Sequence, residues 1–243
     1  MTVVRHPAAR PTLRRLTPAV IPGVRRVFRD TVALGRPLPF PLPGFAAYER
    51  LCLGWFLGPG WEDAAVLDED AQVRGYVLVC TDLPAYRRWA ARAAAAWVLA
   101  TTARLAGGRL PPEAARFYRL RLLDGLQALR EGPAPPMPAV VHLNLDPGLR
   151  GGMEGLRLAR HADRRCAEAG LPGWYGEVNA PVGGRAAGLR RGGFEVVHRA
   201  PNHTLSWLAG RPVERLTIVR SLPRAAAAPA PPAPVPPAAR EAG

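Results

Sequence analysis

The chain has 243 residues, of which 48% are hydrophobic, and a formal net charge of +14 at pH 7. This length and apolar content suit a folded domain with a sizeable core, and no apolar run approaches the roughly 18–20 residues of a membrane span. The three cysteines are odd in number and form no closely spaced pair, which argues against a disulfide framework and against structural zinc. The N-terminus has no apolar block of signal-peptide length, so we expect a cytoplasmic protein without a membrane partner.

The positive charge comes entirely from arginine, because the chain contains no lysine. A large positive charge is typical of nucleic-acid-binding proteins. Here, however, the arginines are spread from end to end, and no dense basic run alternates with aromatic residues. This pattern favours a GC-rich codon bias and a solvated surface over a nucleic-acid partner. Part of the excess charge could serve an anionic ligand.

The first part of the chain predicts one strand and one helix. Residues 1–10 are expected to form a flexible leader, and a single domain is predicted over residues 11–222. Residues 12–16 predict a short edge strand. Thr17-Pro18 then supplies a capping residue followed by a proline suited to the first helical turn, and predicts a helix that ends near residue 33.

A loop, a helix and a hairpin are predicted next. Four prolines between residues 35 and 44 predict an irregular loop. A second helix is predicted over residues 45–57. Residues 64–67 and 73–80 are rich in strand-forming residues, and together they predict a hairpin whose turn lies at residues 68–70.

Residues 83–137 have a different composition, dominated by Ala, Arg and Leu, and predict a helical insert. Glycines and prolines at residues 107–112 break it into a helical hairpin. The second helix of this hairpin runs from Glu113 to about residue 130. Its hydrophobic stripe is predicted to contain Phe117, Leu120, Leu123 and Leu126.

Residues 138–158 read as an apolar strand, a turn, a glycine-bearing loop and the start of a helix. The first N–H groups of a helix lack internal partners, and the helix dipole adds about half a positive charge there. Arg150 adds a full charge and a forked donor at the mouth of the loop. The stretch therefore predicts an anion site suited to phosphate. The alternative is an ordinary strand-to-helix turn that holds no ligand.

The C-terminal part adds strands and short helices. Strands are predicted over residues 174–179, 194–199, 204–208 and 213–220, the last two as a hairpin, with a short helix over 183–191. Residues 223–243 are almost wholly Ala and Pro, and predict a disordered tail. The whole order predicts an α/β domain with a central mixed β-sheet, flanking helices and a helical-hairpin insert.

This order resembles the GNAT superfamily of acyl-CoA-dependent N-acetyltransferases over about residues 12–82 and 138–222. The family loop pattern, Gln/Arg-x-x-Gly-x-Gly/Ala, aligns with Arg150-Gly151-Gly152-Met153-Glu154-Gly155. Asn179 and Gly193-Phe194 match a second family motif. Two positions depart from the family, because Met153 stands where glycine is usual and Leu189 stands at the Tyr that often protonates the departing thiolate.

The resemblance implies acetyl-CoA as a cosubstrate and no metal. It implies that a backbone strand pairs with the pantetheine arm and that the glycine loop cradles the pyrophosphate. The coenzyme-binding residues implied are Leu143, Leu145, Arg150, Gly151, Gly152, Met153, Gly155 and Asn179.

The implied reaction is direct attack of an amine on the thioester, which needs a base beside the splay of the two central strands. Glu177 is one candidate, on the same strand face as Asn179. His142 and Asn144 are the others, and they share a face of the preceding strand. Ordinary structural roles stay open, as an ion-pair partner for Glu177 and as a hydrogen-bonded interior residue for His142.

These observations predict an N-acetyltransferase that moves an acetyl group from acetyl-CoA to a primary amine of a small molecule. A catalytically silent acyl-CoA-binding or scaffold domain is the alternative, and an Arg-rich nucleic-acid-binding regulator is the weaker one. The insert is either a wall of the acceptor pocket or a packing or dimer element. The protein is accordingly predicted to be a monomer or a homodimer.

Overall fold

A seven-stranded sheet with the order β1-β2-β3-β4-β5-β7-β6 runs through the protein. The computed structural model describes residues 10–131 and 137–223. The predicted leader at 1–10 and the predicted tail at 223–243 lie outside these residues, apart from Arg10 and Pro223. Within the described ranges, no helix is both long enough and apolar enough to cross a bilayer.

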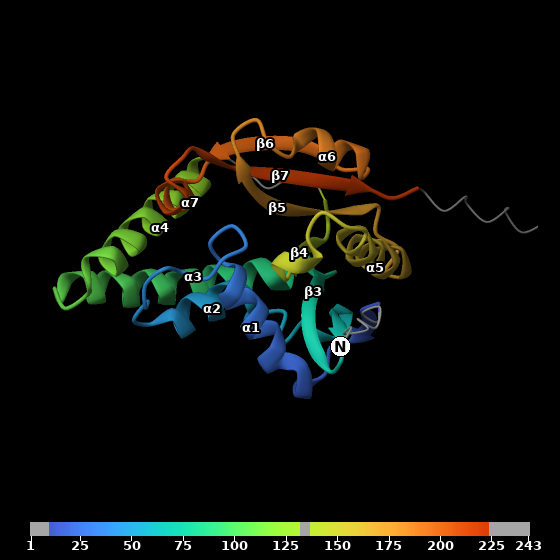
Figure 1. Cartoon of the computed structure of the whole chain (residues 1–243), viewed down its shortest axis with the longest axis horizontal. Helices are drawn as coiled ribbons and strands as arrows, with labels where there is room; N and C mark the ends of the chain where they lie inside the picture. Colours follow the sequence, from blue (N-terminus) through green and yellow to red (C-terminus); the bar gives the residue numbers. More distant parts are fainter. Residues whose placement is uncertain (1–9, 132–136, 224–243) are drawn as a thin grey trace, which may run out of the picture.

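The sheet consists of two antiparallel arms. The first contains β1 (Thr12–Arg15), β2 (Ala65–Glu69), β3 (Gln72–Cys80) and β4 (Val140–Leu145). The second contains β5 (Gly173–Pro181), β7 (Val213–Ser221) and β6 (Glu195–Pro201). A parallel contact between β4 and β5 joins the arms, and Figure 1 shows β5, β7 and β6 arching away from β3 and β4. This confirms the predicted mixed sheet.

Helices cover both faces of the first arm. On one face, α1 (Ile21–Thr31) buries Val24, Val27 and Phe28 against β3, and α2 (Phe45–Leu53) joins the same core. On the other face, α5 (Glu154–Glu168) packs through small side chains that let the helix approach the sheet closely, Ala159 and Ala162 among them. The two faces therefore hold separate hydrophobic cores.

Two predicted boundaries in this region are wrong. The helix predicted over 45–57 ends at Leu53, because glycine-rich turns replace it over residues 54–60. The turn predicted at 68–70 lies at residues 70–71. β2 continues to Glu69, and Asp70 and Ala71 adopt positive φ values of 51° and 61° while the Asp68 side chain accepts a hydrogen bond from the Ala71 N–H.

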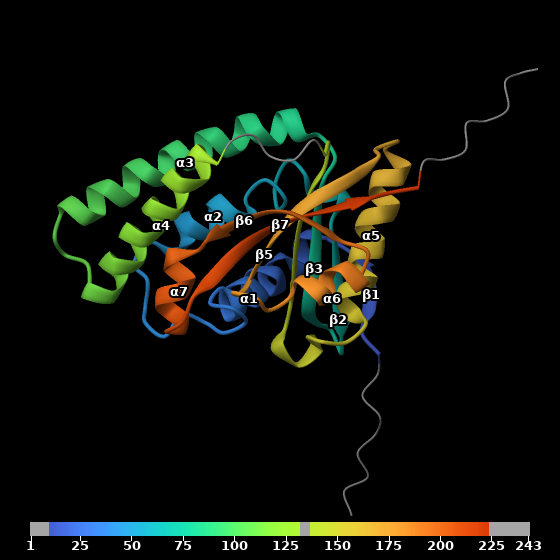
Figure 2. The ribbon, with the colours of Figure 1, turned by 90° about the horizontal axis from the view of Figure 1, so that it is seen from above.

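The helical insert is confirmed as a hairpin of α3 (Leu83–Ala106) and α4 (Pro112–Arg130). Figure 2 shows it along one side of the molecule, with α4 next to α7 (His203–Ala209). The predicted stripe on α4 is wrong in its second half, because Leu123 and Leu126 are 45% and 54% exposed. Asp124 is buried there instead, because this part of α4 faces the polar N-terminus of α7.

The predicted hairpin of residues 204–208 with 213–220 is also wrong. Residues 203–209 form α7, and β7 pairs with β6 across it. Asn202 caps this helix by accepting a hydrogen bond from the Leu205 N–H, and Gly210 ends it with a φ of 63°. Tertiary contacts from α4 thus outweigh the alternating pattern of the segment. The short helix predicted over 183–191 is present as α6 (Ala186–Arg191).

Candidate active site

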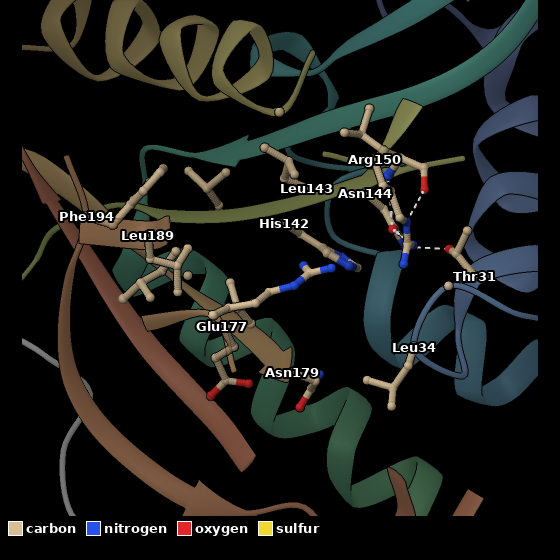
Figure 3. A pocket seen from close by; sticks show the side chains of 18 of the residues that line it. Thr31, Leu34, His142, Leu143, Asn144, Arg150, Glu177, Asn179, Leu189 and Phe194 are labelled. Atoms are coloured by element: carbon tan, nitrogen blue, oxygen red, sulfur yellow. Dashed lines mark hydrogen bonds between the residues drawn. The ribbon is translucent and has the colours of Figure 1, made fainter. Parts of the chain in front are cut away.

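The two central strands separate after a single paired position, Val140 opposite Tyr175. Beyond it they enclose a pocket of about 1180 Å³ that is lined from β4, β5, β7 and all the α-helices from α1 to α7. Figure 3 shows its two sides, with Asn144 and Arg150 across from Glu177 and Asn179. The pocket joins the predicted coenzyme residues to an aromatic region under the insert.

Alternate residues of β4 direct their backbone groups into this splay. The Asn144 carbonyl faces β3, where it lies 3.0 Å from the position of a Cβ on Gly75. The Val141 carbonyl faces β5 in the same way, 2.9 Å from a Cβ placed on Gly176. Because strand residues alternate, the N–H and C=O of Leu143 also point toward β5, yet they have no paired residue there. A free strand edge therefore lies within the pocket.

Side chains already occupy the next position of this edge. The Leu145 N–H donates to Asn144 Oδ1 at 3.0 Å, and the Leu145 carbonyl accepts from Arg150 Nε at 3.0 Å. Arg150 Nη2 also donates to Asn144 Oδ1 at 3.0 Å. A ligand that pairs with β4 finds Leu143 free, whereas at Leu145 it competes with Arg150.

Arg150 folds inward rather than over the glycine loop. A Cβ on Gly35 would lie 2.0 Å from Arg150 Nη1, so Gly35, with a φ of +93°, leaves the space that the guanidinium fills. Asn144 Nδ2 donates to Thr31 Oγ1 at 2.6 Å and thereby ties α1 to β4 (Figure 3). Both the oxygen and the nitrogen of the Asn144 amide are thus hydrogen-bonded to neighbouring groups, which suits a positioning role better than proton transfer.

The glycine loop and the start of α5 form the opposite end of the pocket. Gly151 has a φ of +83°, and a Cβ on Gly152 would meet no atom closer than 3.9 Å. Gly155 lines the pocket at the first turn of α5, where backbone N–H groups have no acceptor within the helix. Met153 is 59% exposed and does not line the pocket, so its side chain leaves this surface open.

Three arginines, Arg150, Arg185 and Arg191, line this end. Among the described residues, no carboxylate forms an ion pair with any of them, and the nearby Asp146 pairs with Arg74 at 2.8 Å. Burial and the charge of Arg185 lower the pKa of Arg150. The uncompensated positive charge and the free helix N–H groups fit an anionic group such as the pyrophosphate of a coenzyme.

His142 lies in an aromatic cage on the other side of the splay. Its ring meets those of Phe28, Phe56 and Tyr76 edge-on, with centroids 5.6–6.3 Å apart. Burial lowers the pKa of His142 to about 4, outweighing a hydrogen bond with the Cys52 backbone. The imidazole is therefore neutral at neutral pH.

Glu177 is the predicted candidate that carries a carboxylate. Its side chain is 52% exposed, and its nearest cation is Arg215, whose Nε lies 3.7 Å from Glu177 Oε1. Asn179 shares its face of β5, and Asn179 Oδ1 accepts from Asn202 Nδ2 at 2.8 Å, which connects β5 to the cap of α7. Glu177 thus has a half-exposed carboxylate on the pocket wall, and Asn179 connects this wall to α7.

Cys52 is the thiol that lines this pocket. Burial raises its pKa to about 11, so the thiol stays protonated at neutral pH and is a poor nucleophile. Leu189 and Phe194 lie together at the end of the pocket opposite Thr31 (Figure 3), and neither side chain offers a proton. Within the described ranges, no cluster of three or more His, Cys, Asp or Glu side chains is arranged to hold a metal ion.

Sequence reasoning missed several pocket residues, of which Tyr86 on α3 and Arg121 on α4 are the clearest, whereas Phe117 on α4 was named as a residue that could line such a wall. They show that the insert is a wall of the pocket. A signal for Arg121 exists in the sequence, because it follows the buried Phe117 by one helical turn. A search for hydrophobic residues on this stripe passes over it.

No protein-family model matches the chain, and a search of curated proteins gives no match. Solved structures do resemble it. The crystal structure of SsHAT aligns with a TM-score of 0.60 and 22% identity, covering 88% of this chain and 98% of that one. An agmatine N-acetyltransferase mutant in its apo form aligns with a TM-score of 0.52 and 15% identity, covering 88% of this chain and 100% of that one. The chain has the fold of the GNAT N-acetyltransferases, as predicted.

Proposed function

We propose that the protein is an N-acetyltransferase that moves an acetyl group from acetyl-CoA to a primary amine of a small molecule. The observation that carries this proposal is the continuous pocket across the β4–β5 splay. One end offers free helix N–H groups and arginines, the middle offers a free strand edge, and the other end is aromatic. A long ligand with an anionic head and a thioester tail matches that sequence of surfaces.

Each proposed coenzyme-binding residue is assigned to the part of acetyl-CoA that its free groups could contact. Gly151, Gly152 and Gly155 offer backbone N–H groups to the pyrophosphate, and Leu143 offers its free backbone groups to the pantetheine amides. Acetyl-CoA supplies an activated acyl group whose thiolate is a good leaving group. Arg150 is proposed to reach the phosphates by leaving Leu145, which also frees this second position of the strand edge.

The chemistry proposed is direct transfer. The amine nitrogen forms a bond to the thioester carbonyl carbon, the carbon–sulfur bond breaks, and the proton lost by the amine passes to the Glu177 carboxylate. Glu177 suits this role because its carboxylate is half exposed and, among the described residues, forms an ion pair with Arg215 alone, at 3.7 Å. The protonated Cys52 thiol favours this route over an acyl-enzyme. With Leu189 at the pocket end, the thiolate is proposed to take its proton from water.

A catalytically silent coenzyme-binding domain is the second candidate, favoured by Leu189, which brings no hydroxyl to the pocket. One experiment separates the two. The protein is incubated with acetyl-CoA and a panel of primary amines, with release of free thiol followed in time and acetylated products identified by mass spectrometry. Amine-dependent thiol release supports the enzyme. Calorimetric binding of acetyl-CoA without transfer to any amine supports the silent domain, and no binding contradicts both.

A further inference from the structure

Arg121 on α4 is a cation placed inside the aromatic part of the pocket. Its guanidinium carbon lies 5.4 Å from the centre of the Tyr48 ring, and its side chain is 27% exposed. Phe117, one turn earlier on α4, lines the same wall. This places a positive charge at the end of the pocket that faces away from the glycine loop.

The carboxylate next to Arg121, that of Asp124, already accepts four hydrogen bonds from other groups. Asp124 Oδ2 forms an i,i+3 ion pair with Arg121 Nη1 at 3.7 Å, a distance too long for a hydrogen bond. Asp124 Oδ1 accepts from the N–H and Nδ1 of His203 at 2.8 and 2.9 Å. Asp124 Oδ2 accepts from the hydroxyl and N–H of Thr204 at 2.6 and 3.2 Å. The carboxylate is therefore committed to the N-terminus of α7, and Arg121 donates no hydrogen bond to any described residue.

Other half-buried arginines of this protein behave differently. Arg165 donates to Asp63 at 2.9 Å with 29% of its side chain exposed, and Arg220 donates to Asp163 at 2.8 Å with 19% exposed. A desolvated guanidinium with unused donors is costly unless a partner arrives. Arg121 thus differs by facing a pocket with its donors free, as a ligand-binding arginine does.

The two charged groups of this part of the pocket have opposite signs and lie on different walls, Glu177 on β5 and Arg121 on α4. A substrate with an ammonium and a carboxylate is oriented by such a pair, because each charge attracts one end and repels the other. Rings such as Phe28, Tyr48 and Phe117 line the same pocket and offer an apolar surface.

We infer that the acceptor is an aminocarboxylic acid, whose carboxylate pairs with Arg121 while its amine meets the thioester beside Glu177. This inference rests on the proposed acetyltransferase function and names its substrate class. The planar guanidinium suits a carboxylate because it donates two parallel hydrogen bonds to it.

The first test compares acids with the amines that lack only the carboxylate. The wild-type protein is assayed for acetylation of phenylalanine against phenethylamine, histidine against histamine, and lysine against cadaverine. A charged hydrogen-bonded contact predicts that kcat/KM for the preferred acid exceeds that of its amine by about 10- to 150-fold. Equal values, or a preference for the amines, would overturn the inference and leave the acetyltransferase proposal intact. Transfer to none of the six contradicts the proposed function itself.

The second test removes the charge. Arg121→Gln is expected to lower kcat/KM for the acid by about 10- to 150-fold, mainly through KM, while changing the paired amine by less than about threefold. Arg121→Lys is expected to recover part of the loss, because it keeps the charge but not the fork. Arg119→Gln, an exposed arginine two residues away on α4, is the matched control.

Calorimetric binding of acetyl-CoA and the melting temperature show whether Arg121→Gln keeps the fold and the coenzyme site. An equal loss of activity toward acids and amines would assign Arg121 a structural role and overturn the inference. If Arg121→Gln does not fold, the acid-to-amine ratio of the wild-type protein decides alone. If no transfer occurs, calorimetry of phenylalanine against phenethylamine with coenzyme A present decides, and equal affinities count against the inference.

Discussion

The two halves of the pocket are built on different principles. The coenzyme half uses backbone groups, namely the free edge of β4, the glycine loop and the first turn of α5. The acceptor half uses side chains from α1, α2, the insert and β5, which are brought together only by the fold. A backbone site tolerates changes of side chain, whereas a side-chain site depends on each of its members.

The comparison also explains where charge is compensated. At the coenzyme half, the pocket arginines have no described carboxylate partner and await an anion. At the acceptor half, Asp124 is buried and satisfied by four hydrogen bonds, which fix α7 against the insert. We therefore expect mutations in the acceptor half to cost stability as well as activity, and mutations in the coenzyme half to cost mainly binding.

The largest effect is predicted for Asp124→Ala. It leaves four donors at the start of α7 without their acceptor, so the free energy of unfolding should fall by about 3–4 kcal/mol. Asp30→Ala removes an exposed i,i+4 ion pair with Arg26 and should cost less than about 0.5 kcal/mol. Urea unfolding followed by circular dichroism measures both, and a loss under 1 kcal/mol for Asp124→Ala would show that α7 does not depend on the insert.

Acidification should destabilise the acceptor half next. His142 has a pKa of about 4 in the fold, below its ordinary value, so the unfolded chain binds the extra proton first. Stability is then lost as the pH falls from about 6.5 to about 4, by up to about 3 kcal/mol from this residue. Unfolding of wild type and His142→Gln is compared at pH 7.5 and 4.5. The variant should lose less free energy of unfolding than wild type between these two pH values. An identical decrease in both proteins would contradict burial of the neutral ring.

The chemical step should depend on Glu177. Glu177→Gln should lower kcat by about 100-fold, or about 2.7 kcal/mol, with acetyl-CoA affinity unchanged, because only proton removal is lost. Glu195→Gln, on an exposed position of β6, is the control. A steady-state assay of thiol release measures the effect. A decrease in kcat of less than threefold would show that another group acts as the base.

The coenzyme half should respond through binding alone. Arg150→Ala should weaken acetyl-CoA binding by about 1–3 kcal/mol if Arg150 reaches the pyrophosphate. Met153→Gly is the matched change on the same loop, and should alter affinity by less than about 0.5 kcal/mol because the Met153 side chain lies outside the pocket. Calorimetry measures both. Unchanged or tighter binding by Arg150→Ala would show that its contact with Leu145 only obstructs the coenzyme.

The same difference decides what could be predicted from the sequence. The strand, loop and helix over residues 138–158 are contiguous, so local rules predict β4, the glycine loop and α5 together. The fold follows from the order of such units. What these rules missed depends on distant contacts, as in α7, which forms because Asp124 lies 79 residues earlier and accepts from its N-terminus.

Residues of the acceptor half were predicted less completely for a related reason. His142 and Glu177 were named as candidates because they lie on strands next to the motif, and both line the pocket. Arg121 lies in an insert whose position relative to the sheet cannot be predicted from a local pattern. Even the inward turn of Arg150 depends on Gly35 and Asn144, one of which lies 115 residues away. A site whose side chains come from separate segments can be identified only once the fold is known.

The central claim, that acetyl-CoA spans the β4–β5 splay, is tested most directly by a crystal structure of the complex with acetyl-CoA. The account predicts pantetheine hydrogen-bonded to the Leu143 backbone, the pyrophosphate on the N–H groups of the glycine loop, and the thioester facing Glu177. A coenzyme whose pantetheine arm lies outside the splay, or no bound coenzyme at millimolar concentration, would contradict it.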